Sequence, residues 1–400
     1  MRYIRPGYYD DFQCAADKCP DTCCAGWQIV IDEESLKKYA DKKGPVGRRL
    51  AESIDWQEGC FFQNQGRCAF LNERNLCDLV TEEGEQMLCK TCASYPRHVE
   101  EYDGLRELSL SLSCPVAAEM ILTEQEPFSF LSEENEESDP LEDEFEDFDF
   151  LMFTALEDAR GVLFELLQKR NLSLQERMKL ILELAARMQD CVDEDRVFEL
   201  EDVIFDFADD VRHRKDAGGD GVVRNPSMET AQADADNGRR DSARQDSGRL
   251  RFERLRENFC VFYQMEQLRE EWSGILDGVQ NTLYGKDYEA YAKLRSEFLR
   301  QFGEEDETSL WWQRFLENLL VFFLYTYFCG AVYDDWIYSK AAMGVFSVCY
   351  LEELVMGSWA IAGRKISREK CIELAWRYAR ELEHSDENLN LLEEWLQERR

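Results

Sequence analysis

The segment CAADKCPDTCC, residues 14–24, is the part of the sequence around which the rest is organised. It contains four cysteines, and ten of the fifteen cysteines of the chain lie within the first 114 residues. The stretch from Cys60 to Cys77 is rich in turn residues and has only short apolar islands, so we expect a metal to organise it. The ten are Cys14, Cys19, Cys23, Cys24, Cys60, Cys68, Cys77, Cys89, Cys92 and Cys114.

The first residues of the chain indicate the cellular compartment, and the compartment in turn indicates whether the cysteines form disulfides or bind a metal. Arg2 and Arg5 are not followed by an apolar run, so we expect no secretory signal and place the protein in the cytoplasm. In a reducing compartment dense cysteines indicate metal ligation or redox chemistry, and an odd total fits a disulfide framework poorly. Only His98 lies near the cysteines, which favours ligation by thiolates alone. Both zinc and a [4Fe-4S] cluster accept four cysteines, so the metal stays open.

Two sequence motifs that are typical of proteins that bind S-adenosylmethionine are absent from this sequence. Radical enzymes space three cysteines as Cys-x3-Cys-x2-Cys; Cys19 and Cys23 begin this pattern, but its third position is Gly26. The register that opens at Cys14 has four residues before Cys19, so it fails as well. No Gly-x-Gly-x-Gly loop follows a predicted strand, which argues against a conventional nucleotide-binding fold.

Length and composition limit the classes of protein to consider. A chain of 400 residues with 44% hydrophobic residues can bury two cores, so we expect two domains. The net charge of -36 argues against nucleic-acid partners and favours basic ones. The most apolar run, Leu319 to Val332, is shorter than the roughly 20 residues of a membrane span. We therefore expect a buried core helix there and no membrane span.

Periodicity predicts a mainly α protein, in which a small cysteine-rich, metal-binding α+β domain precedes an all-helical domain. Near the N-terminus we expect strands at residues 25–32 and 105–113 and helices at 33–42 and 116–122. Beyond residue 150, apolar residues recur at three- and four-residue spacing. This spacing predicts helices at 151–168, 174–190, 252–274, 288–302, 310–328, 339–356 and 367–383.

Changes of composition suggest the domain boundaries. Residues 124–149 hold thirteen acidic residues and no Lys or Arg, which indicates a solvated linker or, alternatively, a docking strip for a basic partner. Residues 213–251 are dominated by Gly, Asp, Arg, Ser and Asn, which predicts a disordered insertion. The predicted divisions are a cysteine-rich domain at 1–123, the linker at 124–149, helical parts at 150–212 and 252–400, and the insertion at 213–251.

The N-terminal motifs resemble known families. Cys14-x4-Cys19-x3-Cys23-Cys24, Cys68 to Leu71 with Leu76 to Leu79, and Cys92 to Arg97 resemble the zinc- or iron-chelating proteins named for a CxxCxxCC motif. More closely, Tyr3 to Phe12, Cys23 to Trp27 and Tyr95 to His98 resemble bacterial flagellin lysine-N-methylases. The resemblance covers about the first 120 residues strongly and the remainder only in the order of its helices.

This resemblance implies an enzyme that carries a [4Fe-4S] cluster, with zinc as the alternative, and methylates lysine side chains of flagellin from S-adenosylmethionine. The first two gaps between cysteines, of four and three residues, are longer than the two-residue gaps of the CxxCxxCC pattern, so Cys14 is not assigned as a ligand. Cys60 lies outside the matching segments. On the matching positions, the expected ligands are Cys19, Cys23, Cys68, Cys77 and Cys92, followed by Cys24, Cys89 and Cys114.

Methyl transfer requires a deprotonated amine, close approach to the methyl group and an anionic or aromatic lining for the cationic donor. We expect this pocket where the cysteine domain meets the helices. We assign catalysis to Tyr9, Asp10 and Asp334, and we expect Asp10 or Asp334 to orient the amine. We assign donor binding to Tyr8, Arg97, His98 and Tyr333, and we expect Arg97 to bind the donor carboxylate. Asp335 is a further candidate for the pocket.

Each of these residues also has an ordinary structural explanation, such as packing, capping or solvation. Ligand spacing indicates a metal but says little about turnover. A second interpretation is therefore a protein without enzymatic activity, either an iron-sulfur redox sensor or a zinc-stapled adaptor whose helical domain binds a partner. Binding of S-adenosylmethionine would separate the two classes.

Overall fold

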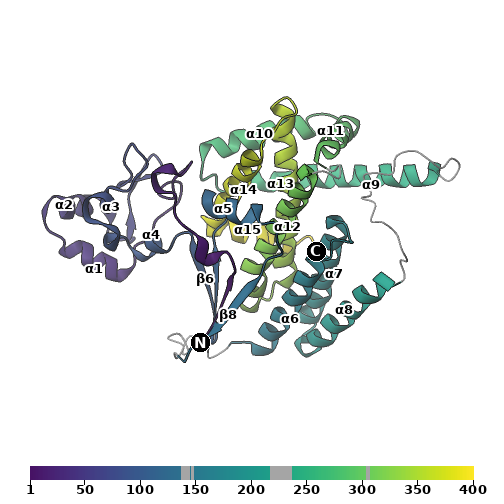
Figure 1. The fold of residues 1–400 in the computed structure, drawn as a ribbon, viewed down its shortest axis with the longest axis horizontal. Helices are drawn as coiled ribbons and strands as arrows, with labels where there is room; N and C mark the ends of the chain where they lie inside the picture. The colour runs from purple at the N-terminus through teal and green to yellow at the C-terminus, as the bar shows by residue number, and fades with distance from the viewer. Residues whose placement is uncertain (137–144, 146–147, 217–236, 303–306) are drawn as a thin grey trace.

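The computed structural model describes residues 1–136, 145, 148–216, 237–302 and 307–400, with the backbone alone for 213–216, 237–247 and 307. Figure 1 shows a small lobe on the left, a sheet in the middle and a body of helices on the right. The described chain is mainly helical after a small α+β region, which confirms the predicted fold class.

A four-stranded sheet joins the two parts. Its strands are β1 (Arg2–Pro6), β6 (Arg97–Tyr102), β7 (Leu105–Leu110) and β8 (Phe130–Glu134), in the order β6-β7-β1-β8. Strand β1 runs parallel to β7 and antiparallel to β8, with Tyr3 opposite Arg106 on one side and Glu133 on the other. Phe130 of β8 lies against Phe164, with ring centroids 5.0 Å apart, so part of the predicted acidic linker is a strand packed on the helical body.

The small lobe has its own hydrophobic core. Asp32 caps its first helix by accepting a hydrogen bond from Ser35 N at 3.0 Å, and it also accepts one from Lys90 N at 2.8 Å. The buried core includes Ile29, Tyr39 and Leu50. Its elements are α1 (Glu33–Asp41), α2 (Gly44–Ser53), α3 (Asp78–Glu83), α4 (Lys90–Ser94) and the short strand pairs β2 (Ile54–Asp55) with β3 (Cys60–Phe61) and β4 (Gln63–Asn64) with β5 (Arg67–Cys68).

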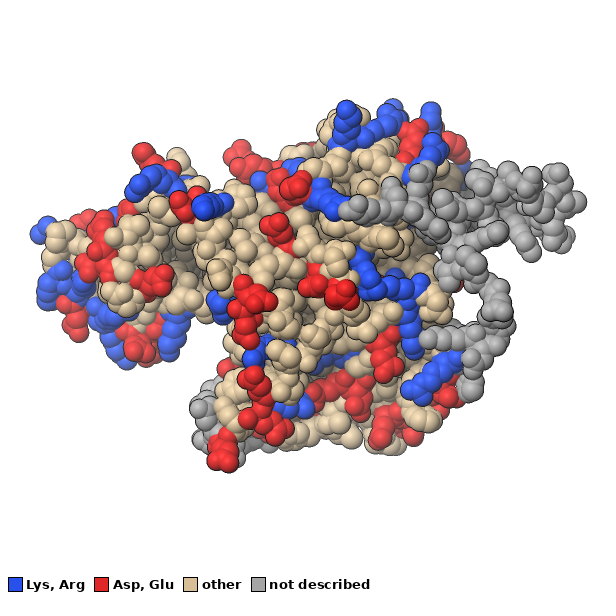
Figure 2. Space-filling view, in the orientation of Figure 1, with Lys and Arg blue, Asp and Glu red and all other residues tan. Residues whose placement is uncertain are grey.

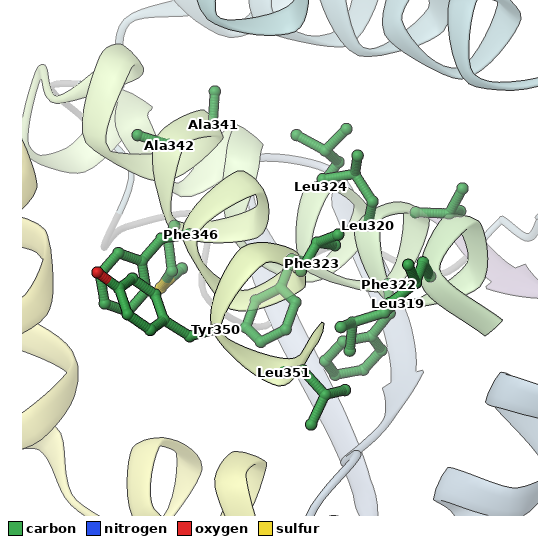
Figure 3. Close-up of a cluster of buried hydrophobic side chains, with 14 of the residues drawn as sticks. Leu319, Leu320, Phe322, Phe323, Leu324, Ala341, Ala342, Phe346, Tyr350 and Leu351 are labelled. Carbon is green, nitrogen blue, oxygen red and sulfur yellow. The ribbon is translucent and has the colours of Figure 1, made fainter. Parts of the chain in front are cut away.

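The helical body is built around α13, which is buried on nearly every side because apolar residues surround its axis. Figure 3 shows Leu320 and Phe323 of α12 beside Ala342 and Phe346 of α13. Its helices are α5 (Pro115–Thr123), α6 (Phe150–Leu167), α7 (Leu174–Asp193), α8 (Leu200–Asp216), α9 (Asn237–Asn258), α10 (Glu270–Tyr284), α11 (Tyr288–Phe302), α12 (Glu307–Tyr327), α13 (Ile337–Ile361), α14 (Arg368–Glu383) and α15 (Asp386–Gln397).

The two hydrophobic cores do not divide the chain at residue 123, where the sequence predicts a domain boundary. One core contains Tyr9, Tyr102 and Leu110 together with the helices, so the N-terminal strand, β6, β7 and α5 pack with the helical body. The second core is confined to the small lobe, between Ile29 and Cys89. Of the predicted insertion at 213–251, residues 217–236 lie outside the described residues. Residues 213–216 and 237–251 belong to helices α8 and α9, so the prediction of disorder was wrong for them.

Three local predictions differ from the structure. The helix expected at 252–274 is divided, because Phe259, Val261 and Phe262 are all buried and a 3₁₀ turn at Phe259–Tyr263 permits this where one helical face would not. Residues 25–32, expected as a strand, form only isolated bridges at Ala25 and Val30. Helix α15 was not expected, although Ser385 caps it by accepting from Asn388 N.

Two helical segments are long and apolar enough to cross a membrane by length and composition, Thr308–Tyr333 and Ile337–Ile361. In their most apolar windows, 83% and 78% of the residues are buried inside the protein. Packing in the core of the helical body accounts for this apolar character.

Candidate functional site

A cavity of about 730 Å³ lies between the small lobe, the end of the sheet and the C-terminal helices. Trp27 and Lys90 line it from the small lobe, Arg97 from β6, and Tyr327, Glu383 and Glu393 from the helices. A cavity therefore lies between the cysteine-rich part and the helical body.

The structure brings together four of the residues that the sequence suggested for the pocket. Arg97, His98, Tyr333 and Asp334 all line the cavity. The Arg97 guanidinium lies 5.2 Å from the ring centroid of Phe12. His98 Nε2 lies 2.7 Å from Glu100 Oε1, and this hydrogen bond raises the pKa of the imidazole. Arg97 and His98 of β6 and the aromatic ring of Tyr333, in the turn before α13, thus line the same cavity.

The structure does not bring the N-terminal candidates Tyr8, Tyr9 and Asp10 into the cavity lining. Tyr8 packs edge-on against Phe128, with ring centroids 5.3 Å apart. Asp10 accepts a hydrogen bond from Arg5 Nε at 2.9 Å, and its side chain is 61% exposed. Tyr9 lies under the Arg97 guanidinium, 5.8 Å from its ring centroid. Asp335, too, lies outside the lining.

Lys340 and Glu393, which are buried, and the exposed Asp334 form a charged group on one wall of the cavity. Lys340 Nζ donates to Glu393 Oε2 at 2.7 Å and lies 2.8 Å from Asp334 Oδ2. Burial alone would lower the pKa of Lys340, but the two carboxylates outweigh it and the pKa is raised. Burial raises the pKa of Glu393, although Lys340 opposes this.

A third carboxyl group in the lining, that of Glu383, is held by the chain segment after β7. Its Oε2 accepts from Ser111 Oγ and Ser113 N, each at 2.7 Å. Burial raises the pKa of Glu383 despite these hydrogen bonds. The Tyr327 hydroxyl lies 3.5 Å from Oε1 of the same carboxylate. Glu383 therefore fixes the end of α14 against the segment that follows β7 and presents its carboxyl group to the cavity.

His384 lies between two aromatic rings at the small-lobe side. Its ring centroid is 4.7 Å from that of Trp27 and 5.7 Å from that of Tyr95. Burial, followed by the charges of Arg380 and Arg269, lowers the pKa of His384 to about 3. His384 is therefore neutral at physiological pH, and its Nε2 lies 2.9 Å from Ser113 Oγ.

Three buried polar atoms in the cavity lining have no hydrogen-bond partner among the described residues. They are Thr326 Oγ1, Glu393 Oε1 and His384 Nδ1. Buried polar atoms are nearly always paired, so a ligand with several polar groups fits this space. Apart from the scarcity of histidine, no local sequence signal marks these three residues, because they lie on or at the end of different helices and are brought together only by the fold.

Five cysteines belong to the hydrophobic core of the small lobe or pack against it. Cys68, Cys77 and Cys92 were among the first expected ligands, and they are joined there by Cys24 and Cys89. The Cys92 thiol is hydrogen-bonded to Cys89, which lowers the pKa of Cys89 to about 7. Cys92 also interacts electrostatically with Cys24 and Cys68, so the four thiols share one neighbourhood.

The other expected ligands, Cys19 and Cys23, lie beside this group. Cys23 is hydrogen-bonded to Cys24, and this contact, together with burial, raises its pKa. Cys19 interacts with Cys14 and Cys23, and Cys114 interacts with Cys19 and Cys23. The Cys23–Cys24 pair thus connects two neighbourhoods of thiols.

These thiols have the donor chemistry that zinc and iron-sulfur clusters require. All fifteen cysteines are free, and Cys60 Sγ accepts a hydrogen bond from Gln28 Nε2 at 3.1 Å. Within the described part of the chain, no group of three or more Cys, His, Asp or Glu side chains is placed to hold a metal ion. The donor set fits a metal in chemistry but not in its present arrangement.

The sequence matches a family model and several curated proteins. The model of the FliB lysine N-methylase C-terminal domain matches residues 160–400. The flagellar biosynthetic protein FliU of Salmonella muenchen is 32% identical over 128 residues, which cover 30% of this chain and 76% of that protein. The lysine-N-methylases of Salmonella choleraesuis and Salmonella typhimurium are each 32% identical over 128 residues.

The match to the two lysine-N-methylases covers 30% of this chain and about a third of their length, 32%. The family model covers most of the helical body, from within α6 to the end of the chain. The cysteine motifs lie outside this region, so they carry no information about the family of the helical body. No solved structure matches the chain.

Proposed function

The chain belongs to the FliB lysine N-methylase family, and from this premise we propose that it is a cytoplasmic enzyme that transfers methyl groups from S-adenosylmethionine to lysine side chains of flagellin. The observation that carries the proposal is the cavity of about 730 Å³ with an acidic and aromatic lining. A cationic sulfonium donor and a lysine amine both suit such a lining.

The proposed reaction is a direct displacement. The neutral amine nitrogen of the substrate lysine attacks the methyl carbon, the carbon–sulfur bond breaks, and its electron pair remains on sulfur. The products are methyl-lysine and the neutral thioether S-adenosylhomocysteine, and one proton leaves the nitrogen. The cavity contributes by aligning the two reactants and excluding water, which alone supplies a large share of such a rate enhancement.

Four cavity residues have proposed roles in this reaction. Arg97 and His98 bind the carboxylate end of the donor, because a guanidinium can form two parallel hydrogen bonds with a carboxylate. Tyr333 provides an aromatic face beside the sulfonium, and Asp334 orients the incoming amine. Tyr8, Tyr9 and Asp10 lie outside the cavity lining, so their assigned roles receive no support from its geometry; Tyr9 has only an indirect contact, through Arg97.

The experiment that tests the proposal is incubation of anaerobically purified protein with flagellin and labelled S-adenosylmethionine. We expect methyl-lysine in flagellin, identified by mass spectrometry. Asp334→Asn should lower the rate, whereas the neighbouring Asp335→Asn, which alters a carboxylate outside the cavity, should not. The absence of methyl-lysine with metal-replete protein and of any heat of S-adenosylmethionine binding would overturn the proposal.

We also propose that the small lobe holds a [4Fe-4S] cluster, with zinc as the alternative. The proposed ligands come from Cys19, Cys23, Cys68, Cys77 and Cys92 and from the adjacent Cys24 and Cys89. When bound, the metal would tie together the loops of the lobe that form one side of the cavity.

A visible spectrum of the anaerobically purified protein distinguishes these metals. A brown protein with iron and sulfide supports the cluster, and a colourless protein with one equivalent of zinc overturns it. Substitution of Cys92 by Ser should remove the metal, whereas Cys60→Ser should retain it, because Cys60 lies outside the proposed ligand set. The metal content of the two variants provides a readout that does not depend on methylation.

A further inference from the structure

Glu393 has one oxygen occupied and one oxygen free at the wall of the cavity. Its side chain is held by Lys340 through Oε2, at 2.7 Å. Its Oε1 is buried and has no partner among the described residues, and the residue is only 4% exposed. A buried carboxylate oxygen without a partner is costly, since the lost hydrogen bonds to water are not replaced. This oxygen is therefore suited to accept a hydrogen bond from a bound ligand.

The surroundings of Glu393 indicate the chemistry of that ligand. Thr326 Oγ1, on α12, is a second buried atom in the same lining without a partner. Phe322 and Leu389 add apolar surface nearby in the lining. The adjacent cation Lys340 is already paired with Asp334 and Glu393, so it has no need of an anionic ligand. Hydrogen-bond acceptors beside apolar surface suit a primary amine on an aliphatic stem.

We propose that Glu393 receives the lysine side chain that is to be methylated. Its Oε1 accepts the N–H of the substrate nitrogen and then takes the proton that must leave before attack, while Thr326 accepts a second N–H. This inference rests on the proposed function of the cavity. It adds two residues, on α12 and α15, that neither the motifs nor the family match assigns.

Lys340 explains why this carboxylate can perform both tasks. Its ammonium group fixes one oxygen of Glu393 and leaves the other directed to the ligand. The positive charge of Lys340 also disfavours a second ammonium nearby and so promotes loss of the substrate proton. The proton passes from the substrate nitrogen to Oε1 and from there to water, and the lone pair that remains forms the new bond to the methyl carbon.

Glu393→Gln tests the proposal directly, because the amide keeps the shape but cannot take the proton. We expect kcat/KM for a lysine peptide to fall at least about 100-fold, the usual scale for loss of a general base. The matched control is Glu394→Gln, which removes an exposed carboxylate at the next position and should leave kcat/KM unchanged. Calorimetric binding of S-adenosylmethionine should be the same in all three proteins.

Loss of the ion pair with Lys340 could by itself unfold the variant, so two further variants separate folding from function. The double variant Lys340→Met/Glu393→Gln removes both charges of the ion pair. If the pair only stabilises the fold, the double variant should recover activity. If Glu393 takes the substrate proton, the double variant should be folded but inactive. Thr326→Val removes a hydroxyl that has no partner, so the fold should be kept while KM for the peptide rises several-fold.

Binding of n-butylamine, which mimics the lysine side chain, provides a readout without turnover. It should raise the melting temperature of the wild type and of Glu394→Gln but not that of Thr326→Val. Wild-type methylation that persists in Glu393→Gln, in the double variant and in Thr326→Val would overturn the inference alone. An inactive wild type that does not bind S-adenosylmethionine would instead overturn the proposed function.

Discussion

At the scale of single residues, the helical body depends on charges that are buried and paired across the sheet. Glu107 of β7 is 2% exposed and receives both terminal nitrogens of Arg160 on α6, with Nη1–Oε2 at 2.6 Å. Arg160 also donates to the Tyr325 carbonyl at 3.1 Å. Three N–H groups of Arg160 thus have oxygen partners although the side chain is buried, and these contacts tie α6 and α12 to the sheet.

Glu107→Gln should destabilise the protein strongly, because the Arg160 charge would remain buried without a compensating carboxylate. Removal of one partner from a buried pair costs about 3–5 kcal/mol. Denaturant unfolding measures the change. Glu33→Gln is the control, since the Glu33–Lys37 pair is 88% and 77% exposed and such pairs contribute little. Equal stability of the two variants would contradict this account of the buried pair.

His384 should contribute a recognisable pH dependence of stability. Its native pKa is about 3, below the ordinary value of 6.5, so the unfolded chain binds the proton first as pH falls. Stability linked to His384 is therefore present above about pH 6.5 and is lost between pH 6.5 and 3, by at most about 1.4 kcal/mol per pH unit. Burial raises the pKa of Glu381 to about 7, which gives the opposite slope between pH 4.5 and 7.

The contribution of His384 is isolated by comparing His384→Gln with the wild type at each pH. We expect the difference in the free energy of unfolding to change with pH between 3 and 6.5 and to be constant above that range. A difference that is independent of pH throughout would show that the pKa of His384 is the same in the native and the unfolded state, and would contradict this account.

At the scale of helices, the core is set by how closely α13 approaches its neighbours. A Cβ atom added at Gly357 of α13 would lie 2.8 Å from Val279 Cγ1 and 3.1 Å from Val279 Cβ, on α10. A valine in a helix has one strongly preferred rotamer, so it cannot turn away. The absence of a side chain at Gly357 therefore permits the close contact of these two helices.

Gly357→Ala should lower the free energy of unfolding by about 1–3 kcal/mol, the usual cost of overpacking a core. Gly274→Ala, in the exposed middle of α10, provides the matched comparison, because an added Cβ there meets no atom within 4 Å. It should stabilise the protein by about 0.5–1 kcal/mol through the entropy of the unfolded chain. Thermal unfolding of both variants, with effects of opposite sign, checks the prediction.

At the scale of the whole molecule, charge is the dominant feature of the surface. Figure 2 shows acidic side chains over the centre and lower part of one face, while basic side chains are frequent on the small lobe. The net charge is -36. A potential of this sign attracts basic surfaces and accelerates their encounter with the protein.

Methylation of a lysine-rich substrate should therefore depend on salt. Between about 0.05 and 0.5 M NaCl the Debye length falls from about 14 Å to about 4 Å, which screens long-range attraction. We expect KM for a basic peptide to rise several-fold while kcat changes little. A peptide of the same length with a single lysine and no net charge should show a much weaker dependence. Identical behaviour of the two peptides would exclude electrostatic attraction as a source of affinity.

The sequence by itself determined the local elements and the fold class. Apolar spacing such as that of Met178, Ile181 and Ala185 predicts a helix because it reports a buried face within a few turns, and α7 lies there. The absence of a glycine-rich loop after a predicted strand and the broken cysteine spacing at Gly26 favour a site at the boundary between the cysteines and the helices. A cavity with Arg97, His98, Tyr333 and Asp334 in its lining lies at that boundary.

Only the tertiary structure decided the composition of the site and the division of the core. Glu393 and Thr326 carry no motif, because an acid or a threonine in an amphipathic helix looks the same whether it is solvated or faces a cavity. The ring centroids of Trp27 and His384 lie 4.7 Å apart although more than 350 positions separate the two residues in the chain. Such contacts arise from helix packing, and local periodicity contains no information about which distant faces will meet.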